Sequence, residues 1–203
     1  PSVMAFSDSP LHLTGQQWPY NFTYNGALVG VSVDVVHALL EEAGVKNSTI
    51  ENMPWARAYQ LAKAESNVLI FSITRTLERE SLFKWIGTIA PVDYSFFARK
   101  KSGLRIENLE SARQLRVATT NGDVVDQLFK RLDFPFVQSV GGQNAYEQNV
   151  RKLLNGRVDV WGVATLPAIY FLQSTDRRGE IVRVGAIREL DSEGMYVAFG
   201  SMT

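Results

Sequence analysis

The sequence of 203 residues contains no cysteine. This absence excludes disulfide bonds, thiol catalysis and metal sites built on thiolates. Histidine is almost as scarce, since only His12 and His37 occur, and a histidine-based metal centre or catalytic triad would lack its residues. We expect His37 on the solvated face of a helix and His12 in an N-terminal loop. His12 and Asp123 are the only obvious candidates for acid–base chemistry, so we expect no catalytic residues, no metal and no cofactor.

Long apolar runs and an excess of charge of one sign are also missing. No apolar run approaches the roughly 20 residues of a membrane-spanning helix. The chain carries 21 basic and 21 acidic residues, so nucleic acid and anionic membrane surfaces are not expected partners. The sequence begins at Pro1 without a methionine, and we expect that a signal peptide has been removed. The composition, 45% apolar and 11% aromatic, suits the core of one large or two small domains.

What the sequence does contain is an alternation of apolar strands and amphipathic helices. The expected helices cover residues 30–44, 56–63, 76–83, 124–132, 144–155 and 165–173. The expected strands cover residues 68–73, 94–100, 116–120, 136–140, 158–163, 181–184 and 195–199. Two successive α/β units, with a strand at their junction and another at the end, predict two lobes with a cleft between them.

The segment from residue 68 to residue 79 is the most informative part of the chain. An apolar, β-branched strand ends in Thr74 and is followed by Arg75 and Arg79. Hydroxyl groups, helix N–H groups and guanidinium groups gathered at one point suit a small anion, most simply a carboxylate. Because ligands of open α/β sheets bind beyond the carboxyl ends of strands, we expect this segment to face residues 120–123.

Four segments carry a resemblance to a known family. Residues 30–36, 72–79, 115–122 and 155–160 read GVSVDVV, SITRTLER, LRVATTNG and NGRVDV. They resemble the motifs G-F-D-V-D-L, G-M-T-I-T-P-E-R, K-R-V-G-V-x-x-G and S-G-[KR]-[VI]-D-A, respectively. These motifs are typical of the bacterial extracellular solute-binding proteins of family 3, the periplasmic receptors of polar amino acid uptake, and the chain resembles an uncharacterised branch of that family.

The resemblance implies the two-lobed α/β fold of periplasmic binding proteins, the Venus-flytrap fold. Lobe one would comprise residues 1–97 and 195–203, and lobe two residues 98–194. The two hinge strands would be residues 94–100 and 195–199. The family's helices after the second hinge strand have no counterpart here, and we expect missing sequence after Thr203 because lobe one would otherwise expose apolar surface.

The resemblance also implies a carboxylate clamp in lobe one. Arg79 matches the arginine whose planar fork holds the ligand carboxylate, whereas the pattern alone fits equally well a surface arginine paired with Glu78 or Glu80. As an arginine exposed in the cleft, it would contribute little to the core. Thr74 matches a residue that also meets the carboxylate, and Ser72 matches a backbone carbonyl near the ligand amine.

Aromatic side chains would form the walls of the site. Trp55 falls where the family places a side chain that stacks on the ligand, and Trp18 and Tyr20 fall near the opposite wall. Core packing is the alternative for each tryptophan. Arg75 replaces an apolar residue of the family motif, and it either adds a second cation to the pocket or points away and pairs with a neighbouring glutamate.

The second lobe departs from the family pattern. Asp123 and Val124 stand where the family often has two threonines. The family's aspartate for the ligand α-ammonium falls at or near Ala164, and no acid occurs there. A buried ammonium without its carboxylate is costly, so we expect carboxylates without an α-amine to bind better than amino acids. Asp123 either supplies the missing charge or caps the following helix, and Trp161 faces either the cleft or the core.

The resemblance implies a non-enzymatic protein that binds a small carboxylate-bearing solute between its lobes. The leading hypothesis is a monomeric periplasmic receptor that delivers the solute to an ABC-type permease. The alternative is the extracellular ligand-sensing domain of a membrane signalling protein, in which closure is transmitted and no cargo is delivered. An enzyme of the same fold is a third hypothesis, for which the sequence offers no paired acids.

Overall fold

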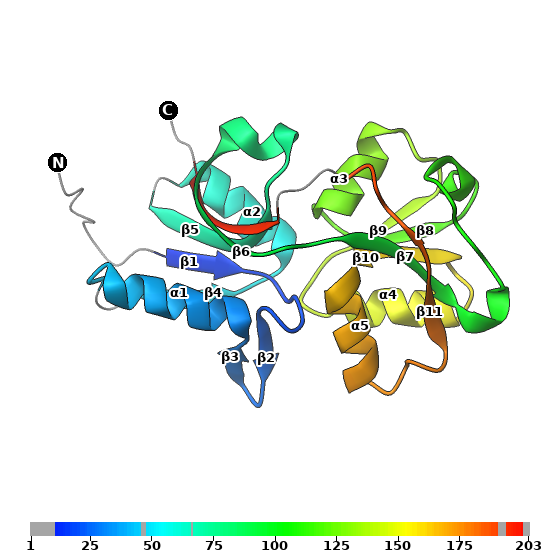
Figure 1. Cartoon of the computed structure of the whole chain (residues 1–203), viewed down its shortest axis with the longest axis horizontal. Helices are drawn as coiled ribbons and strands as arrows, with labels where there is room; N and C mark the ends of the chain where they lie inside the picture. Colours follow the sequence, from blue (N-terminus) through cyan, green and yellow to red (C-terminus); the bar gives the residue numbers. More distant parts are fainter. Residues whose placement is uncertain (1–10, 46–47, 66, 191–193, 201–203) are drawn as a thin grey trace.

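The computed structural model describes residues 11–45, 48–65, 67–190 and 194–200. Expectations for the ends of lobe one, residues 1–10 and 201–203, lie outside the described residues. The described residues form two α/β lobes side by side, each built on a five-stranded sheet (Figure 1). This arrangement confirms the two lobes predicted from the alternation of strands and helices.

The sheet of lobe one has the strand order β4-β1-β5-β12-β6. Its strands are β1 (Leu11–Thr14), β4 (Thr49–Asn52), β5 (Val68–Thr74), β6 (Phe83–Ala90) and β12 (Met195–Gly200). The first three run parallel, whereas β12 is antiparallel to both β5 and β6. A small hairpin of β2 (Phe22–Tyr24) and β3 (Ala27–Val29) leads into helix α1.

Two helices cover the two faces of this sheet. Helix α1 (Val31–Glu42) packs Val33, Val36 and Leu40 against Leu69 and Phe71 of β5. Helix α2 (Trp55–Ala64) packs Ala58, Tyr59 and Ala62 against Leu13, Ile70 and Ile73 on the opposite face. All seven residues of β5 are buried, as expected for a strand covered on both faces.

The sheet of lobe two has the strand order β11-β7-β10-β8-β9. Its strands are β7 (Tyr94–Arg99), β8 (Val117–Thr120), β9 (Val137–Val140), β10 (Val160–Ala164) and β11 (Ile181–Ala186), and its helices are α3 (Val124–Arg131), α4 (Ala145–Leu154) and α5 (Thr165–Ser174). Helix α3 packs on one face, and helices α4 and α5 pack on the other. Trp161 is fully buried under α4 and α5, so it belongs to the core and not to the cleft.

The chain passes from one lobe to the other twice, at residues 91–93 between β6 and β7 and again between β11 and β12 (Figure 1). Strand β7 lies entirely in the sheet of lobe two, where it pairs with β10 and β11. The first crossing therefore precedes the expected boundary after residue 97. Strand β12 likewise lies entirely in lobe one, so the connections themselves, not these two strands, span the lobes.

Most of the expected elements are present within one or two residues of their predicted ends, including α1, α2, β5, α3, α4 and α5. The segment after Thr76 forms a 3₁₀ helix, Leu77–Leu82. Five strands, β1, β2, β3, β4 and β6, were not predicted. His12 was expected in a loop, but it lies in β1 and is fully buried, which corrects that expectation, whereas His37 is exposed as expected.

Candidate ligand-binding site

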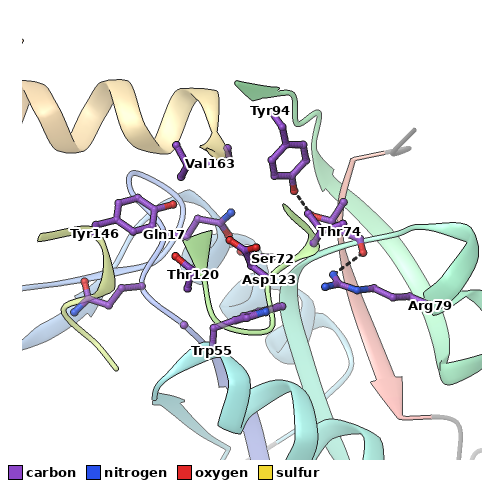
Figure 2. A pocket seen from close by; sticks show the side chains of 14 residues that line it. Gln17, Trp55, Ser72, Thr74, Arg79, Tyr94, Thr120, Asp123, Tyr146 and Val163 are labelled. Carbon is purple, nitrogen blue, oxygen red and sulfur yellow. Dashed lines mark hydrogen bonds between the residues drawn. The ribbon is translucent and has the colours of Figure 1, made fainter. Parts of the chain in front are cut away.

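A cavity of about 50 Å³ lies between the two lobes (Figure 2). It is found where strands end, because Thr74, Thr120 and Ala164 are the last residues of β5, β8 and β10. Its lining is drawn from both lobes: Gly15, Gln16, Gln17, Trp55, Ser72, Thr74 and Arg79 come from lobe one, and Tyr94, Thr120, Asp123, Val124, Tyr146, Val163 and Ala164 come from lobe two. The two segments predicted to face each other, residues 74–79 and 120–123, therefore both contribute to this cavity.

Arg79 is the cation at the wall of the cavity, and its side chain is nearly inaccessible to solvent, with 1% exposed. Its Nη1 group donates to the carbonyl oxygen of Thr74 at 3.1 Å, and its guanidinium carbon lies 5.0 Å from the centre of the Tyr59 ring. Burial lowers the pKa of Arg79, while the neighbouring Tyr59, Tyr94 and Asp123 oppose that shift. Arg79 forms no ion pair with Glu78 or Glu80, so it is not the surface arginine that the sequence pattern alone allowed.

Thr74 and Tyr94 form the polar wall beside Arg79. Their hydroxyl oxygens lie 2.5 Å apart, and both side chains are buried (Figure 2). Burial raises the pKa of Tyr94, so its phenol keeps its proton at neutral pH. A shared hydroxyl pair next to a guanidinium is a suitable set of donors for one carboxylate.

Ser72 occupies a β-bulge in β5. Tyr196 pairs with Ile73 and Val197 pairs with Phe71, so Ser72 is the extra residue between them. Its φ angle is +57°, a left-handed conformation that is uncommon for a residue other than glycine and is often found near functional sites. The bulge turns the hydroxyl toward Asn21, whose side-chain oxygen accepts a hydrogen bond from it at 2.5 Å.

Trp55 is the first residue of α2, and its ring spans the cleft. Its Nε1 group donates to the carbonyl oxygen of Gly122 in lobe two at 3.0 Å. The indole thereby closes one side of the cavity and joins the lobes at the same time. Gly15 faces the indole so closely that a β-carbon there would lie 3.2 Å from Trp55 Cβ.

Asp123 has two roles, because it caps α3 and also lines the cavity. Its Oδ1 atom accepts a hydrogen bond from the backbone N–H of Asp126 at 2.7 Å, which confirms the predicted N-cap. Burial raises the pKa of Asp123 to about 7, while the bond from Asp126 and the charge of Arg79 oppose the rise. The cavity therefore contains one arginine and one acid that titrates near neutral pH.

Comparisons with known proteins bear on this geometry. The profile of the bacterial extracellular solute-binding proteins, family 3, matches residues 12–152. The chain belongs to this family. The match extends over more than half of the chain and includes Trp55, Arg79 and Asp123. A search of curated protein sequences found no match.

Solved structures show the same fold. A mutant of ArgBP from T. maritima superposes with a TM-score of 0.80 at 21% identity, covering 94% of this chain and 80% of that one. ArtJ from Geobacillus stearothermophilus, described as an arginine-, lysine-, histidine-binding protein, gives a TM-score of 0.79 at 15% identity, covering 96% and 83%. A histidine kinase sensor domain similar to periplasmic binding proteins gives 0.78 at 20% identity, covering 95% and 82%. These likenesses confirm the two-lobed fold of periplasmic binding proteins.

Three residues predicted for the site of this family 3 protein lie outside the cavity lining. Arg75 points away and forms a bidentate pair with Glu80, at 2.8 and 2.7 Å. Trp18 stacks on Phe22, with ring centres 4.0 Å apart, and also contacts the aromatic rings of α5 in lobe two. Tyr20 is buried, and its carbonyl oxygen accepts from Ser32 at the start of α1.

Several lining residues were not predicted. Tyr94 was identified only as part of a hinge strand, and Tyr146 only as part of the apolar stripe of α4. Burial raises the pKa of Tyr146 well above its usual value, so this phenol is also neutral. Thr120, which was expected at this edge as part of residues 120–123, is partly buried, and its hydroxyl has no hydrogen-bond partner among the described residues. Its position at the end of a parallel strand was the signal for that expectation.

The described residues also bear on metals and membranes. Within residues 11–45, 48–65, 67–190 and 194–200, no group of three or more histidine, aspartate or glutamate side chains is placed to hold a metal ion. In that same part of the family 3 chain, no helix has the length and apolarity needed to cross a bilayer.

Proposed function

We propose that this protein binds a small carboxylate-bearing solute between its two lobes. The observation that carries the proposal is Arg79, a buried arginine at the wall of a cavity lined by both lobes. A buried guanidinium needs acceptors, and a carboxylate is the acceptor whose geometry best matches its planar fork. The hydroxyls of Thr74 and Tyr94 supply further donors to the same anion.

The chemistry of lobe two favours solutes without an α-amine. Ala164 and Val163 present apolar surface to the cavity, and Asp123 is the acid that lines it. Because the pKa of Asp123 is about 7, this side chain carries only part of a negative charge at neutral pH. An ammonium group would therefore find weaker compensation here than beside a fully ionised carboxylate.

In the periplasmic role that we propose, the solute is delivered to an ABC-type permease. Membership of the extracellular solute-binding family supports this role. Closure of the lobes around the solute would give the permease a recognisable surface, and the protein would act as a monomer without catalysis. A sensor is the second candidate, favoured by the likeness to a histidine kinase sensor domain that spans 95% of this chain.

A thermal-shift panel tests the binding proposal. The panel compares acetate, lactate and succinate with L-arginine, L-lysine and L-glutamine at equal concentrations. A ligand present at 100 times its Kd should stabilise the folded state by about 2.7 kcal/mol. We expect a larger rise in Tm from at least one of the simple carboxylates than from any amino acid, and the largest rise from a common amino acid would contradict the proposed ligand class.

A further inference from the structure

Gln127, on α3 in lobe two, occupies one edge of the Arg79 guanidinium. Its Oε1 atom accepts from Nε of Arg79 at 3.3 Å and from Nη2 at 3.0 Å. These two N–H groups lie on the same side of the planar fork, so the amide oxygen stands where one oxygen of a carboxylate would stand. Nη1 also donates to Thr74, so these three hydrogen bonds use three of the five N–H groups of Arg79 and leave two for other acceptors.

The other end of the Gln127 amide is also engaged. Its Nε2 atom donates to the carbonyl oxygen of Gly122 at 3.2 Å, and the same oxygen accepts from Trp55 Nε1 at 3.0 Å. The amide is thereby oriented, because its oxygen faces a cation and its nitrogen faces a carbonyl. A continuous chain of hydrogen bonds thus leaves lobe one at Arg79, passes through Gln127 and Gly122, and returns to lobe one at Trp55.

Apart from the buried Thr74–Tyr94 pair beside the first crossing, two other polar contacts between the lobes are more exposed. Arg131 pairs with Glu78 across the cleft, but these side chains are 47% and 52% exposed, and solvent screens such a pair. Gln143 donates to the carbonyl oxygen of Asn52 at 2.9 Å at an exposed position. The Arg79–Gln127 contact is charge-assisted and its guanidinium is buried, so it is the strongest of these polar bonds between the lobes.

We propose that Gln127 is a latch that holds Arg79 across the cleft and lets the lobes close without a ligand. The latch also positions the remaining N–H groups of Arg79 for a ligand, so that ligand and latch favour the same closed state. The apparent affinity of a protein for its ligand increases in proportion to the fraction of the protein that is already in the binding-competent state. This inference rests on the proposed carboxylate site, but the closing of the lobes can be measured with no ligand present.

Spin labels on the two lobes report the closed state directly. The chain has no cysteine, so labels can be attached through Glu41→Cys on α1 and Gln173→Cys on α5, both exposed positions. Without ligand, double electron–electron resonance on this labelled protein should show a short distance that Gln127→Ala loses. Gln138→Ala is the matched control, because Gln138 bonds to the carbonyl of Arg157 within lobe two, and it should keep the short distance.

Two further measurements complete the test. Gln127→Glu keeps the oxygen and adds a charge facing Arg79, so it should raise the short-distance fraction above that of the unsubstituted glutamine. Titration with acetate should need about ten times more acetate to close Gln127→Ala than to close the labelled protein. Circular dichroism checks that each variant is folded.

The outcomes separate the latch from the proposed function. Equal distance distributions in Gln127→Ala and the labelled protein, or a decrease in Gln127→Glu, would overturn the latch. If Gln127 controls the distance as expected while the six compounds of the panel all fail to bind, the latch stands and the carboxylate site fails. Binding of acetate with no effect of either Gln127 substitution leaves the carboxylate site and removes the latch.

Discussion

Arg79 shows how far a residue's role depends on its surroundings. The resemblance to family 3 implied that it contacts a ligand, and in the structure its side chain lies at the wall of the cavity. The accompanying expectation, that it would be exposed and contribute little to the core, is wrong. The 3₁₀ turn after Thr76 directs the side chain inward, where it packs over Tyr59 and binds the Thr74 carbonyl.

Replacing Arg79 by lysine tests both roles at once. Lysine keeps the charge but loses the planar fork, so we expect affinity for the best carboxylate of the panel to fall about ten- to a hundredfold. The free energy of unfolding should also fall by about 1–3 kcal/mol, because acceptors in Thr74 and Gln127 lose their donors. Calorimetry and urea unfolding measure the two effects. The control is Arg75→Lys, outside the cavity, and an unchanged affinity in Arg79→Lys would remove the arginine from the site.

We expect Asp123 to make the proposed carboxylate binding depend on pH. Three of the ionisable groups around it keep their charge state at neutral pH, because Arg79 stays charged and Tyr94 and Tyr146 stay neutral. Asp126 stays ionised, because hydrogen bonds from Lys130, Ser139 and Gly122 outweigh the effect of burial and lower its pKa. With a pKa of about 7, Asp123 is mostly neutral at pH 6 and mostly negative at pH 8.

Acetate affinity should therefore fall as the pH rises from about 6 to 8, because a second anion enters the cavity. Asp123→Asn should bind acetate with little dependence on pH over this range, and it should remain folded because asparagine is an equally good N-cap. Calorimetric titrations at several pH values measure the effect. A dependence that persists unchanged in Asp123→Asn would assign it to another group.

At the scale of elements, the helices and strands that could be predicted are those in which one regular face is buried, because such a face gives a periodic apolar pattern in the sequence. Helices α1 to α5 and strand β5 have such patterns and were predicted. Strand β6 was missed because it lies at the edge of its sheet, where only Phe83 is buried and the other residues are exposed or half-buried. Strand β4 is four residues long and partly exposed, so it leaves little apolar signal.

The bulge at Ser72 could not be predicted from the sequence. A serine in the sequence does not indicate a positive φ angle. The bulge depends on the register in which β5 pairs with β12, a strand more than 120 residues later in the chain. The resemblance still predicted Ser72 for the site, because a family motif gives the position of a site residue even where the strand pairing that shapes it cannot be predicted.

Strand β1 holds a buried histidine that should make stability depend on pH. Neither ring nitrogen of His12 has a hydrogen-bond partner among the described residues, and burial lowers the pKa of the ring, with a smaller contribution from His37. The unfolded chain takes up a proton near pH 6.5, whereas the folded protein resists it until a lower pH. The contribution of His12 to stability is therefore complete above pH 6.5 and is lost as the pH falls through that value.

His12→Leu should flatten this dependence. Between pH 6.5 and 5 the free energy of unfolding of the natural sequence should fall by up to about 1.4 kcal/mol per pH unit more steeply than that of His12→Leu. Urea unfolding at pH 7.5, 6.5 and 5.5 measures both slopes. His37→Leu, on the exposed face of α1, removes only the smaller contribution and should change the slope much less, whereas equal slopes for His12→Leu and the natural sequence would show that His12 is not the group responsible.

At the scale of the whole molecule, one topological rule was enough to bring the two halves of the site together. Ligands lie beyond the carboxyl ends of strands, and the ends of β5, β8 and β10 do meet at the cavity. The contacts between the lobes were beyond prediction, because Gln127 and Trp18 gain their partners in the other lobe only from the angle at which the lobes meet. The periodicity of a sequence predicts which face of a helix or strand is buried, but it does not predict how two lobes pack against each other.

The position of β12 between β5 and β6 has a consequence for the order of folding. All strands of lobe two come from one continuous stretch, residues 94–186, whereas the sheet of lobe one has a gap until residues 195–200 are synthesised. During synthesis, β5 and β6 present open edges while the whole of lobe two can already fold. Lobe two should therefore fold first, and the pairing of β12 with β5 and β6 then closes the gap in the sheet of lobe one.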